Sequence, residues 1–424
     1  MIGFLAKGLL RDRSRSLFPT LIVTAGVLLT VVLYSYIKGS ENDIINANAR
    51  FISGHLDIMS RAYAAEEDQI PNDLAYIGVS EMIQRLRGEF PGILWTPRIR
   101  FGGLLDVPDE RGETRAQGPA AGIAVNLSDP SSPEREILNL DEALVRGRVP
   151  DSPGGILLGE EFARRLGVSP GETVTLIGTT MYGSLTTANF TVTGTVRFGI
   201  SAMDRGAVIA DVRDIQSALD MEDAAGEILG FFDDLIFRKE ESRAVADTFN
   251  GRYGDRSDPF SPLMRTLRDH GGLAETLDLA NAIGHALVVL FVAIMSIVLW
   301  NAGLMAGLRR YGEFGVRLAI GEDKGHLYRA LLAESLMIGL AGSLAGTAVG
   351  LVISWYLQVH GLDISPMLKN SSMMISDVLR ARITPASWFI GFIPGLAATM
   401  LGASISGRGI YRRQTSQLTK ELER

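Results

Sequence analysis

The sequence predicts a membrane protein with four transmembrane α-helices and an α+β extracytoplasmic domain between the first span and the second. Three observations predict this fold: four apolar runs without charge, strand and helix patterns between the first two runs, and opposite signs of charge in the long and the short connecting segments. The chain has 424 residues, enough for more than one domain, and its mean hydropathy of +0.18 indicates a mixed soluble and membrane protein.

Each apolar run is long enough to cross a bilayer as a helix, which takes about 20 residues. The first run lies between Arg15 and Lys38, and the alternative interpretation of it is a cleavable signal peptide. Its apolar part is too long for that, and the first Ala-x-Ala after it, Ala47 to Ala49, lies too far away. We therefore predict transmembrane helices at 17–37, 280–308, 335–358 and 386–407.

The charge of the connecting segments predicts the orientation, because Lys and Arg are in excess in short cytoplasmic segments. Segments 1–16, 309–334 and 408–424 together carry 14 basic and 7 acidic side chains, so both termini are expected in the cytoplasm of a multi-pass inner-membrane protein. Segment 38–279 carries 24 basic and 39 acidic side chains and is expected outside, as is a short loop at 359–385. An acidic domain of this kind has no electrostatic basis for binding nucleic acid.

Local patterns predict the elements of the external segment. Phe190 to Phe198 alternates apolar residues with Thr and Arg, as a strand with one wet face does. Ser80 is expected to cap a helix that ends at Glu89, and Asp211 to cap a second helix. Strands are predicted at 155–159, 173–177, 190–198 and 206–210 and within 93–107, helices at 160–166 and 212–219, and surface loops at 106–120 and 128–136.

The residues that usually carry chemistry are sparse. There is no cysteine, which excludes disulfides, thiolate metal sites and a cysteine nucleophile. His55 and His270 are the only histidines of segment 38–279, and neither has a metal-binding partner at helical or hairpin spacing. The acidic groups at 66–68 and 233–234 are expected to be solvated surface. We therefore predict no catalytic residues and no metal site.

Small residues follow one face of the third predicted span and recur in the fourth. Such stripes let two helix backbones approach closely. Packing within one chain and packing between two chains would both use them, and both interpretations stay open. Pro394 is expected to kink the fourth span. The residues predicted to pack in this way are Gly339, Gly342, Gly346, Gly350, Gly391 and Gly395.

Three further features concern the membrane boundary. His285 and Asn301 are polar residues inside spans; a proton relay through His285 would need an acidic partner, so an interfacial or packing role is favoured. Segment 1–16 places apolar residues on one side of a helix, as a short amphipathic helix on the inner membrane surface does. The outer ends of spans one and two are expected to continue as helical stalks, through Ile44, Ile45, Leu273 and Leu277.

The loop at 309–334 is the most distinctive stretch. Its pattern predicts a short helix broken at Gly321 and a second helix from about Lys324 that leads into span three. Glu313 and Arg317 lie one turn apart and can pair. From these features alone, an ordinary positively charged loop remains the alternative.

This loop resembles the segment between the second and third spans of MacB/FtsX-type ABC permeases. Arg317 lies one position earlier than the basic residue of the family pattern. In the family this segment is the coupling helix, which docks into the ATP-binding subunit. The resemblance therefore implies an ATPase-coupling role for Arg310, Glu313, Gly315, Arg317, Ala319 and Gly321, and a MacB-like periplasmic fold for the external domain.

The resemblance also implies what the chain works with. The chain contains no Gly-Lys dipeptide and so no Walker A lysine; it binds no cofactor itself, and two copies of a separate ABC subunit would bind ATP and Mg. A second permease chain, identical or different, would complete the assembly. The size of the external segment and the stretch 198–208 look most like the LolC/LolE lipoprotein-release branch. Efflux of amphipathic drugs or peptides, and FtsX-like regulation of an extracytoplasmic enzyme, remain the alternatives.

Overall fold

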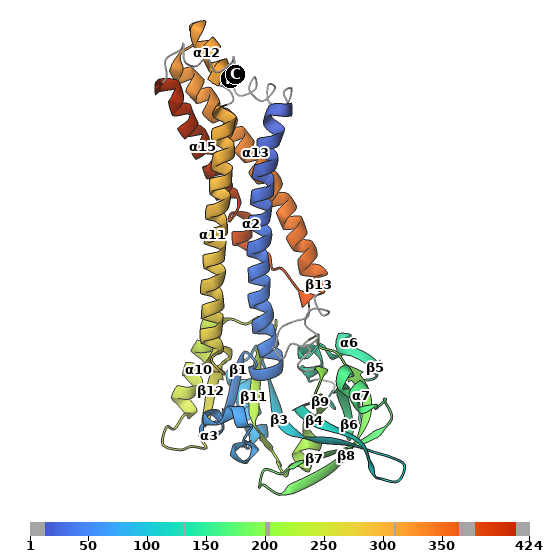
Figure 1. The fold of residues 1–424 in the computed structure, drawn as a ribbon. Coiled ribbons are helices and arrows are strands. Elements are labelled where there is room, and N and C mark those ends of the chain that lie inside the picture. Colours follow the sequence, from blue (N-terminus) through green and yellow to red (C-terminus); the bar gives the residue numbers. More distant parts are fainter. Residues whose placement is uncertain (1–12, 130–131, 200–203, 309–310, 364–377, 413–424) are drawn as a thin grey trace. The chain divides into compact units, whose positions relative to one another are not determined.

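The computed structural model describes residues 13–129, 132–199, 204–308, 311–363 and 378–412 (Figure 1). Contacts divide the chain into a helical unit, formed by Met1–Asn42, Asp278–Leu362 and Leu379–Arg424, and a large domain, formed by Asp43–Leu277 and Asp363–Val378. Residues 1–12 and 413–424 lie outside the described ranges, and with them most of the predicted amphipathic helix and of the C-terminal tail.

Within the described ranges, four helices are long and apolar enough to cross a membrane by length and composition. They are α2 (Arg13–Asn48), α11 (Leu273–Leu308), α13 (Lys324–Val359) and α15 (Phe392–Arg412), with the shorter α12 (Tyr311–Ala319) and the 3-10 turn η5 (Pro385–Trp388) between them. The kink predicted at Pro394 stays a prediction: the candidate span Pro385–Arg408 contains Pro394, and a turn precedes α15 within it. Pro394 lies in the first turn of α15, where the missing N–H is not needed for a helical hydrogen bond.

The glycine stripe of α13 packs against α2 of the same chain. A Cβ atom on Gly342, Gly346 or Gly350 would lie 2.7, 2.8 and 3.0 Å from the Cβ atoms of Val23, Val27 and Val31, respectively. On the neighbouring face of α13, Gly339 meets Thr399 of α15, while Gly391 and Gly395 meet Val27. Packing within one chain therefore accounts for the spacing of these glycines.

In the described part of the large domain, ten strands form one sheet, in the order β12-β1-β11-β3-β4-β9-β6-β8-β5, with β7 paired to β3 and β8. Their bounds are β1 Leu56–Ser60, β3 Ile93–Pro108, β4 Thr114–Val125, β5 Leu144–Gly147, β6 Gly155–Gly159, β7 Thr173–Thr179, β8 Leu185–Val196, β9 Ala207–Asp211, β11 Glu227–Phe232 and β12 Pro262–Thr266. The short strands β2 (Tyr76–Ile77) and β10 (Ala224–Ala225) pair with each other, as do β13 (Leu362–Asp363) and β14 (Val378–Leu379).

Strand β3 belongs to two parts of this sheet. As far as Arg98 it pairs with β11, and from Ile99 onward it pairs with β4. We call β12, β1, β11 and the first part of β3 the first subsheet, and the strands from the second part of β3 to β5, with β7, the second subsheet. Arg98 is thus the last residue of β3 that pairs within the first subsheet.

Helices cover one face of the sheet, and the end of α2 meets the other. Alternate strand residues point to opposite faces: Ile58, Ile228 and Val208 lie in the main core, whereas Leu229 and Ile209 lie in separate clusters. Covering the main core are α4 (Val79–Glu89), α7 (Glu160–Leu166), α9 (Val212–Ala218) and α10 (Lys239–Tyr253). The remaining short elements are η1 Ala49–Ser53, α3 Arg61–Ala65, η2 Glu67–Gln69, η3 Asn72–Leu74, α5 Glu134–Ile137, α6 Leu140–Ala143 and η4 Leu267–Asp269.

Most of the predicted local elements are present. The strand at 155–159, the helix at 160–166 with Gly167 at φ +66°, and the Asp211 N-cap, which accepts a hydrogen bond from the Arg213 N–H, are confirmed. The Ser80 cap is wrong: α4 starts at Val79, and the Asp223 carboxylate accepts hydrogen bonds from the Ser80 N–H and Oγ at 3.0 and 2.6 Å. A residue distant in sequence supplies this cap.

Of the two predicted surface loops, 106–120 is mostly wrong and 128–136 is wrong only at its end. Most of 106–120 is strand, because β3 runs to Pro108 and β4 starts at Thr114. The small residues of β4 have low strand propensity, so the sequence does not predict this strand. It is stabilised by pairing with β3 and β9 on either side. In 128–136, Glu134 begins α5 and its side chain is fully buried.

Candidate functional site

Helix α12 follows the long helix α11 and forms a helix–turn–helix with the start of the long helix α13. Gly321 ends the first helix at φ +95°, a conformation that favours glycine. Asp323 starts the second, because its carboxylate accepts hydrogen bonds from the Gly325 and His326 N–H groups at 2.8 and 3.1 Å. The turn is therefore defined on both sides by its own residues.

One side of α12 is fixed to α13. Phe314 is 2% exposed and packs with Leu327 and Leu331 of α13, while Leu318 is partly buried against the same cluster. Gly315 is buried beside Phe314. The short helix is thus held in place by apolar packing.

The opposite side of α12 exposes apolar residues. Val316 is 50% exposed, Ile320 is 80% exposed, and Ala319 between them is exposed as well. The Ile320 N–H donates to the Val316 carbonyl at 3.1 Å, so the two side chains follow one another at helical spacing. Exposed apolar residues in such a row are typical of a helix that docks into a groove of a partner.

The charged residues of α12 flank this row. The Arg317 Nη2 lies 3.5 Å from the Glu313 Oε1, and the Arg317 Nε lies 4.0 Å from a Glu322 carboxylate oxygen. Arg310 lies outside the described residues. The structure thus brings together Glu313, Gly315, Arg317, Ala319 and Gly321 on and after one helix. Val316 and Ile320 were not among the predicted coupling residues, although their i, i+4 spacing opposite Phe314 was a usable signal.

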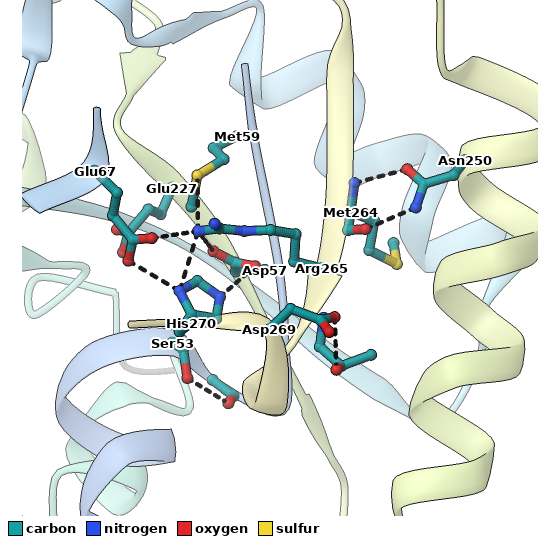
Figure 2. Close-up of polar contacts among 12 residues, drawn as sticks. Ser53, Asp57, Met59, Glu67, Glu227, Asn250, Met264, Arg265, Asp269 and His270 are labelled. Carbon is teal, nitrogen blue, oxygen red and sulfur yellow. Dashed lines mark hydrogen bonds and ion pairs between the residues drawn. The ribbon is translucent and has the colours of Figure 1, made fainter. Parts of the chain in front are cut away.

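A second group of functional-type side chains lies inside the large domain (Figure 2). The imidazole of His270 contacts two carboxylates, with Nε2 2.8 Å from Asp57 and Nδ1 2.9 Å from Glu67. Arg265 pairs with the same Glu67 at 2.5 Å. On the neighbouring strands, Arg100 pairs with Glu227 and lies 3.3 Å from Glu67.

The protonation of this group follows from its contacts. Burial disfavours the charged imidazole, but the adjacent charge of Asp57 and the hydrogen bond with Glu67 outweigh it and raise the pKa of His270 to about 9. Burial would raise the pKa of Glu67, but its contacts with His270 and Arg265 lower it to about 2. At neutral pH, His270 is therefore a cation between two carboxylates.

This arrangement corrects one prediction. Glu67 was expected to be solvated and instead lies in a mostly buried ionic cluster. In the described ranges, no group of three or more His, Cys, Asp or Glu residues is arranged to hold a metal ion. In the cluster, Asp57 and Glu67 face His270 and Arg265, while Glu227 faces Arg100. Opposed charges of this kind hold elements together.

The other histidines have local partners. The His55 Nδ1 accepts a hydrogen bond from the Phe232 N–H at 3.1 Å, and burial lowers its pKa to about 4. The His285 Nδ1 lies 2.7 Å from the Asn281 carbonyl oxygen, one turn earlier in α11. Asn301 is exposed on the same helix.

The sequence matches two family profiles. The profile described as MacB-like periplasmic core domain matches residues 16–234, and the one described as FtsX-like permease C-terminal matches residues 286–415. The chain is a multi-pass membrane protein of the ABC transporter permease class. It belongs to the MacB/FtsX-like permease family, which is non-catalytic and pairs with an ABC ATPase. The predicted family and the predicted fold class are confirmed.

The individual relatives have low sequence identity to this chain. The chain is 25% identical to the lipoprotein-releasing system transmembrane protein LolC of Xylella fastidiosa strain 9a5c. The similarity extends over 270 residues, which are 62% of this chain and 60% of that protein. LolC of the Temecula1 strain is 24% identical over the same shares. The chain thus spans about 60% of the length of these relatives.

Two other proteins are similar to parts of this chain. The macrolide export ATP-binding/permease protein MacB of Psychrobacter cryohalolentis is 22% identical over 178 residues, which is 41% of this chain and 25% of that protein. The crystal structure of the periplasmic region of MacB from Actinobacillus actinomycetemcomitans aligns with a TM-score of 0.36 and 13% identity, covering 52% of this chain and 92% of that one.

Proposed function

We propose that a separate ATP-binding subunit docks on α12, and that this chain passes the ATP-driven movement to its large domain to release lipoproteins from the membrane. The observation that carries the docking proposal is the row Val316, Ala319 and Ile320, which is apolar and exposed on a helix fixed by Phe314. An apolar row on a fixed helix supplies a preformed surface, so little ordering is needed on binding.

The orientation belongs to the same proposal. The excess of basic residues in segments 1–16, 309–334 and 408–424 supports a cytoplasmic location of both termini and of α12. The acidic large domain then lies outside the cytoplasm. This orientation puts α12 on the side of the membrane where ATP is available.

Mechanical transmission is supported by the two helices that lead into the large domain. The boundaries between the units, after Asn42 and after Leu277, fall inside α2 and α11. Within the large domain, Ile44 and Ile45 of α2 pack into one apolar cluster with Leu273 and Leu277 of α11. Both helices are thus anchored in the domain as a pair.

The cargo is proposed from the relatives. Likeness to lipoprotein-releasing LolC proteins supports a lipoprotein. Likeness to a macrolide exporter favours amphipathic drugs or peptides as the second candidate. ATP and Mg are proposed to bind to the partner ATPase, two copies of which would serve two permease chains, identical or different.

Replacing the exposed apolar row tests the docking proposal. The double variant Val316→Asp/Ile320→Asp places two charges on the row and leaves Phe314 untouched. We expect the ATPase to stop copurifying with the permease and its stimulated activity to disappear. Ile236→Asp, at an exposed apolar residue of the large domain, is the matched control and should behave as wild type. An ATPase that still binds the double variant at wild-type strength refutes docking on α12.

A further inference from the structure

The end of α2 inside the large domain has an unusual geometry. After Asn48 the helix continues as the π-helical turn η1, Ala49–Ser53, and stops at Gly54 with φ +64°. A helix end leaves carbonyl oxygens without partners inside the helix. Single π-turns are rare and occur frequently at functional sites.

The π-turn lies between two apolar clusters on one face of the sheet. Ala49 packs in the cluster of Leu229 and Phe231, which belongs to the first subsheet. Phe51 packs in the cluster of Val125, Leu157, Val196 and Ile209, which belongs to the second subsheet. Residues two positions apart in one turn therefore contact both subsheets.

Arg98 joins this turn to the sheet. Its Nη1 donates to the Arg50 carbonyl oxygen at 2.6 Å, and its Nη2 donates to the Glu134 carboxylate at 2.8 Å. The other carboxylate oxygen of Glu134 accepts a hydrogen bond from the Thr96 hydroxyl at 2.9 Å. The side chains of Arg98 and Glu134 are both 0% exposed.

The position of these contacts matters more than their strength. Desolvation makes most buried ion pairs poor sources of stability, and apolar residues of similar volume often replace them without loss. A planar guanidinium, however, holds two partners at fixed directions. Arg98 lies where β3 leaves the first subsheet. Its partner Glu134 is in α5, which ends at Ile137 in the cluster of the first subsheet; the next residue, Leu138, lies in the cluster of the second subsheet.

We propose that Arg98 is the positioning residue that fastens the end of α2 to both subsheets, so that a displacement of α2 moves the large domain as one body. Without it, the π-turn absorbs the displacement. This inference rests on the proposed mechanical transmission. In this proposal, the buried side chain of Arg98 passes the displacement of α2 to the large domain.

Hydrogen-exchange mass spectrometry of the full permease copurified with its ATPase tests the proposal. Exchange is compared with and without ATP plus vanadate, in wild type and in Arg98→Met/Glu134→Leu, which removes both charges together. In that variant we expect exchange at Gly54, whose N–H donates to Ala49, to rise about tenfold. The nucleotide-dependent change in the large domain should disappear, while the change at α12 remains.

The matched control is Arg100→Met/Glu227→Leu, which removes a mostly buried pair between β3 and β11; in the described ranges, the ion pairs of Arg100 are with Glu227 and Glu67, not with α2. This control should keep the wild-type response in the large domain. A response that survives in Arg98→Met/Glu134→Leu, or that disappears in both double variants, overturns the role of Arg98. A wild-type complex without a nucleotide response at α12 refutes the proposed function, and a response at α12 alone refutes transmission and the role of Arg98 with it.

Discussion

The Nε2 of His270 lies 2.8 Å from the carboxylate of Asp57, and the two side chains are 4% and 0% exposed. Asp57 is in strand β1, and His270 precedes α11 by two glycines in the left-handed conformation, Gly271 and Gly272. The ion pair therefore holds the chain against the first subsheet immediately before the two glycines that lead into α11.

This pair predicts a pH dependence of stability. The pKa of about 9 for His270 lies above the ordinary value of 6.5, so the folded protein holds a proton that the unfolded chain releases between these values. The stabilisation is complete below pH 6.5 and is lost as the pH rises through 9. Thermal unfolding should be followed by the fluorescence of buried Trp95, after replacing Trp300, Trp355 and Trp388 with Phe.

The control for this prediction is His270→Gln, which cannot titrate. Its melting temperature should lie below that of wild type at pH 6.5 and change little up to pH 9. Equal slopes in wild type and variant across this range would contradict the role of the His270 pair.

Removing one partner of the buried pair at Arg98 should cost more than removing both. Arg98→Met alone leaves Glu134 charged and buried, and the expected loss is about 3–5 kcal/mol in the free energy of unfolding. Adding Glu134→Leu should recover most of that loss. Urea titration of the two variants measures the difference, and a double variant less stable than the single one would contradict the prediction.

The contact of Gly346 with α2 should tolerate no side chain. An added Cβ would lie 2.6 Å from the Thr24 carbonyl oxygen, so Gly346→Leu must separate α2 from α13. We expect a fall in the yield of folded protein and in its melting temperature in detergent. The matched control is Gly251→Ala in α10, which has free space around it and should gain up to about 1 kcal/mol.

Glu313→Ala/Arg317→Ala separates stability from coupling. A partly exposed i, i+4 pair of this kind contributes about 0.3–0.5 kcal/mol, so the melting temperature should hardly change. Stimulation of the partner ATPase should nevertheless fall, because the two charges flank the exposed apolar row. Wild-type stimulation by this variant would limit the docking surface to Val316, Ala319 and Ile320.

The sequence predicts elements whose signal is local. The helix at 160–166 and its Gly167 terminus, and the strand before Asp211, follow from periodicity and caps. Strand β4 was missed because its residues are mostly Ala, Gly and Pro, whose strand conformation depends on β3 and β9. The cap of α4 was missed for a similar reason, since Asp223 is far from Ser80 in sequence.

The coupling loop and the buried charges show the same difference between local contacts, which the sequence predicts, and contacts between distant residues, which it does not. Glu313 and Arg317 are neighbours on one helix, so their pairing can be predicted from spacing. Glu67 and Glu134 are paired by residues more than 30 positions away, and an acidic residue with no basic partner nearby in sequence is more often solvated. Their burial became visible only in the folded sheet.

The exposed row on α12 also concerns the life of the chain before assembly. A permease subunit synthesised without its ATPase presents Val316 and Ile320 to the surrounding water. Chaperones and quality-control proteases recognise such apolar surface, so we expect unassembled copies to be degraded faster than assembled ones. Docking would then set subunit stoichiometry as well as coupling, with the amount of ATPase limiting how much permease persists in the membrane.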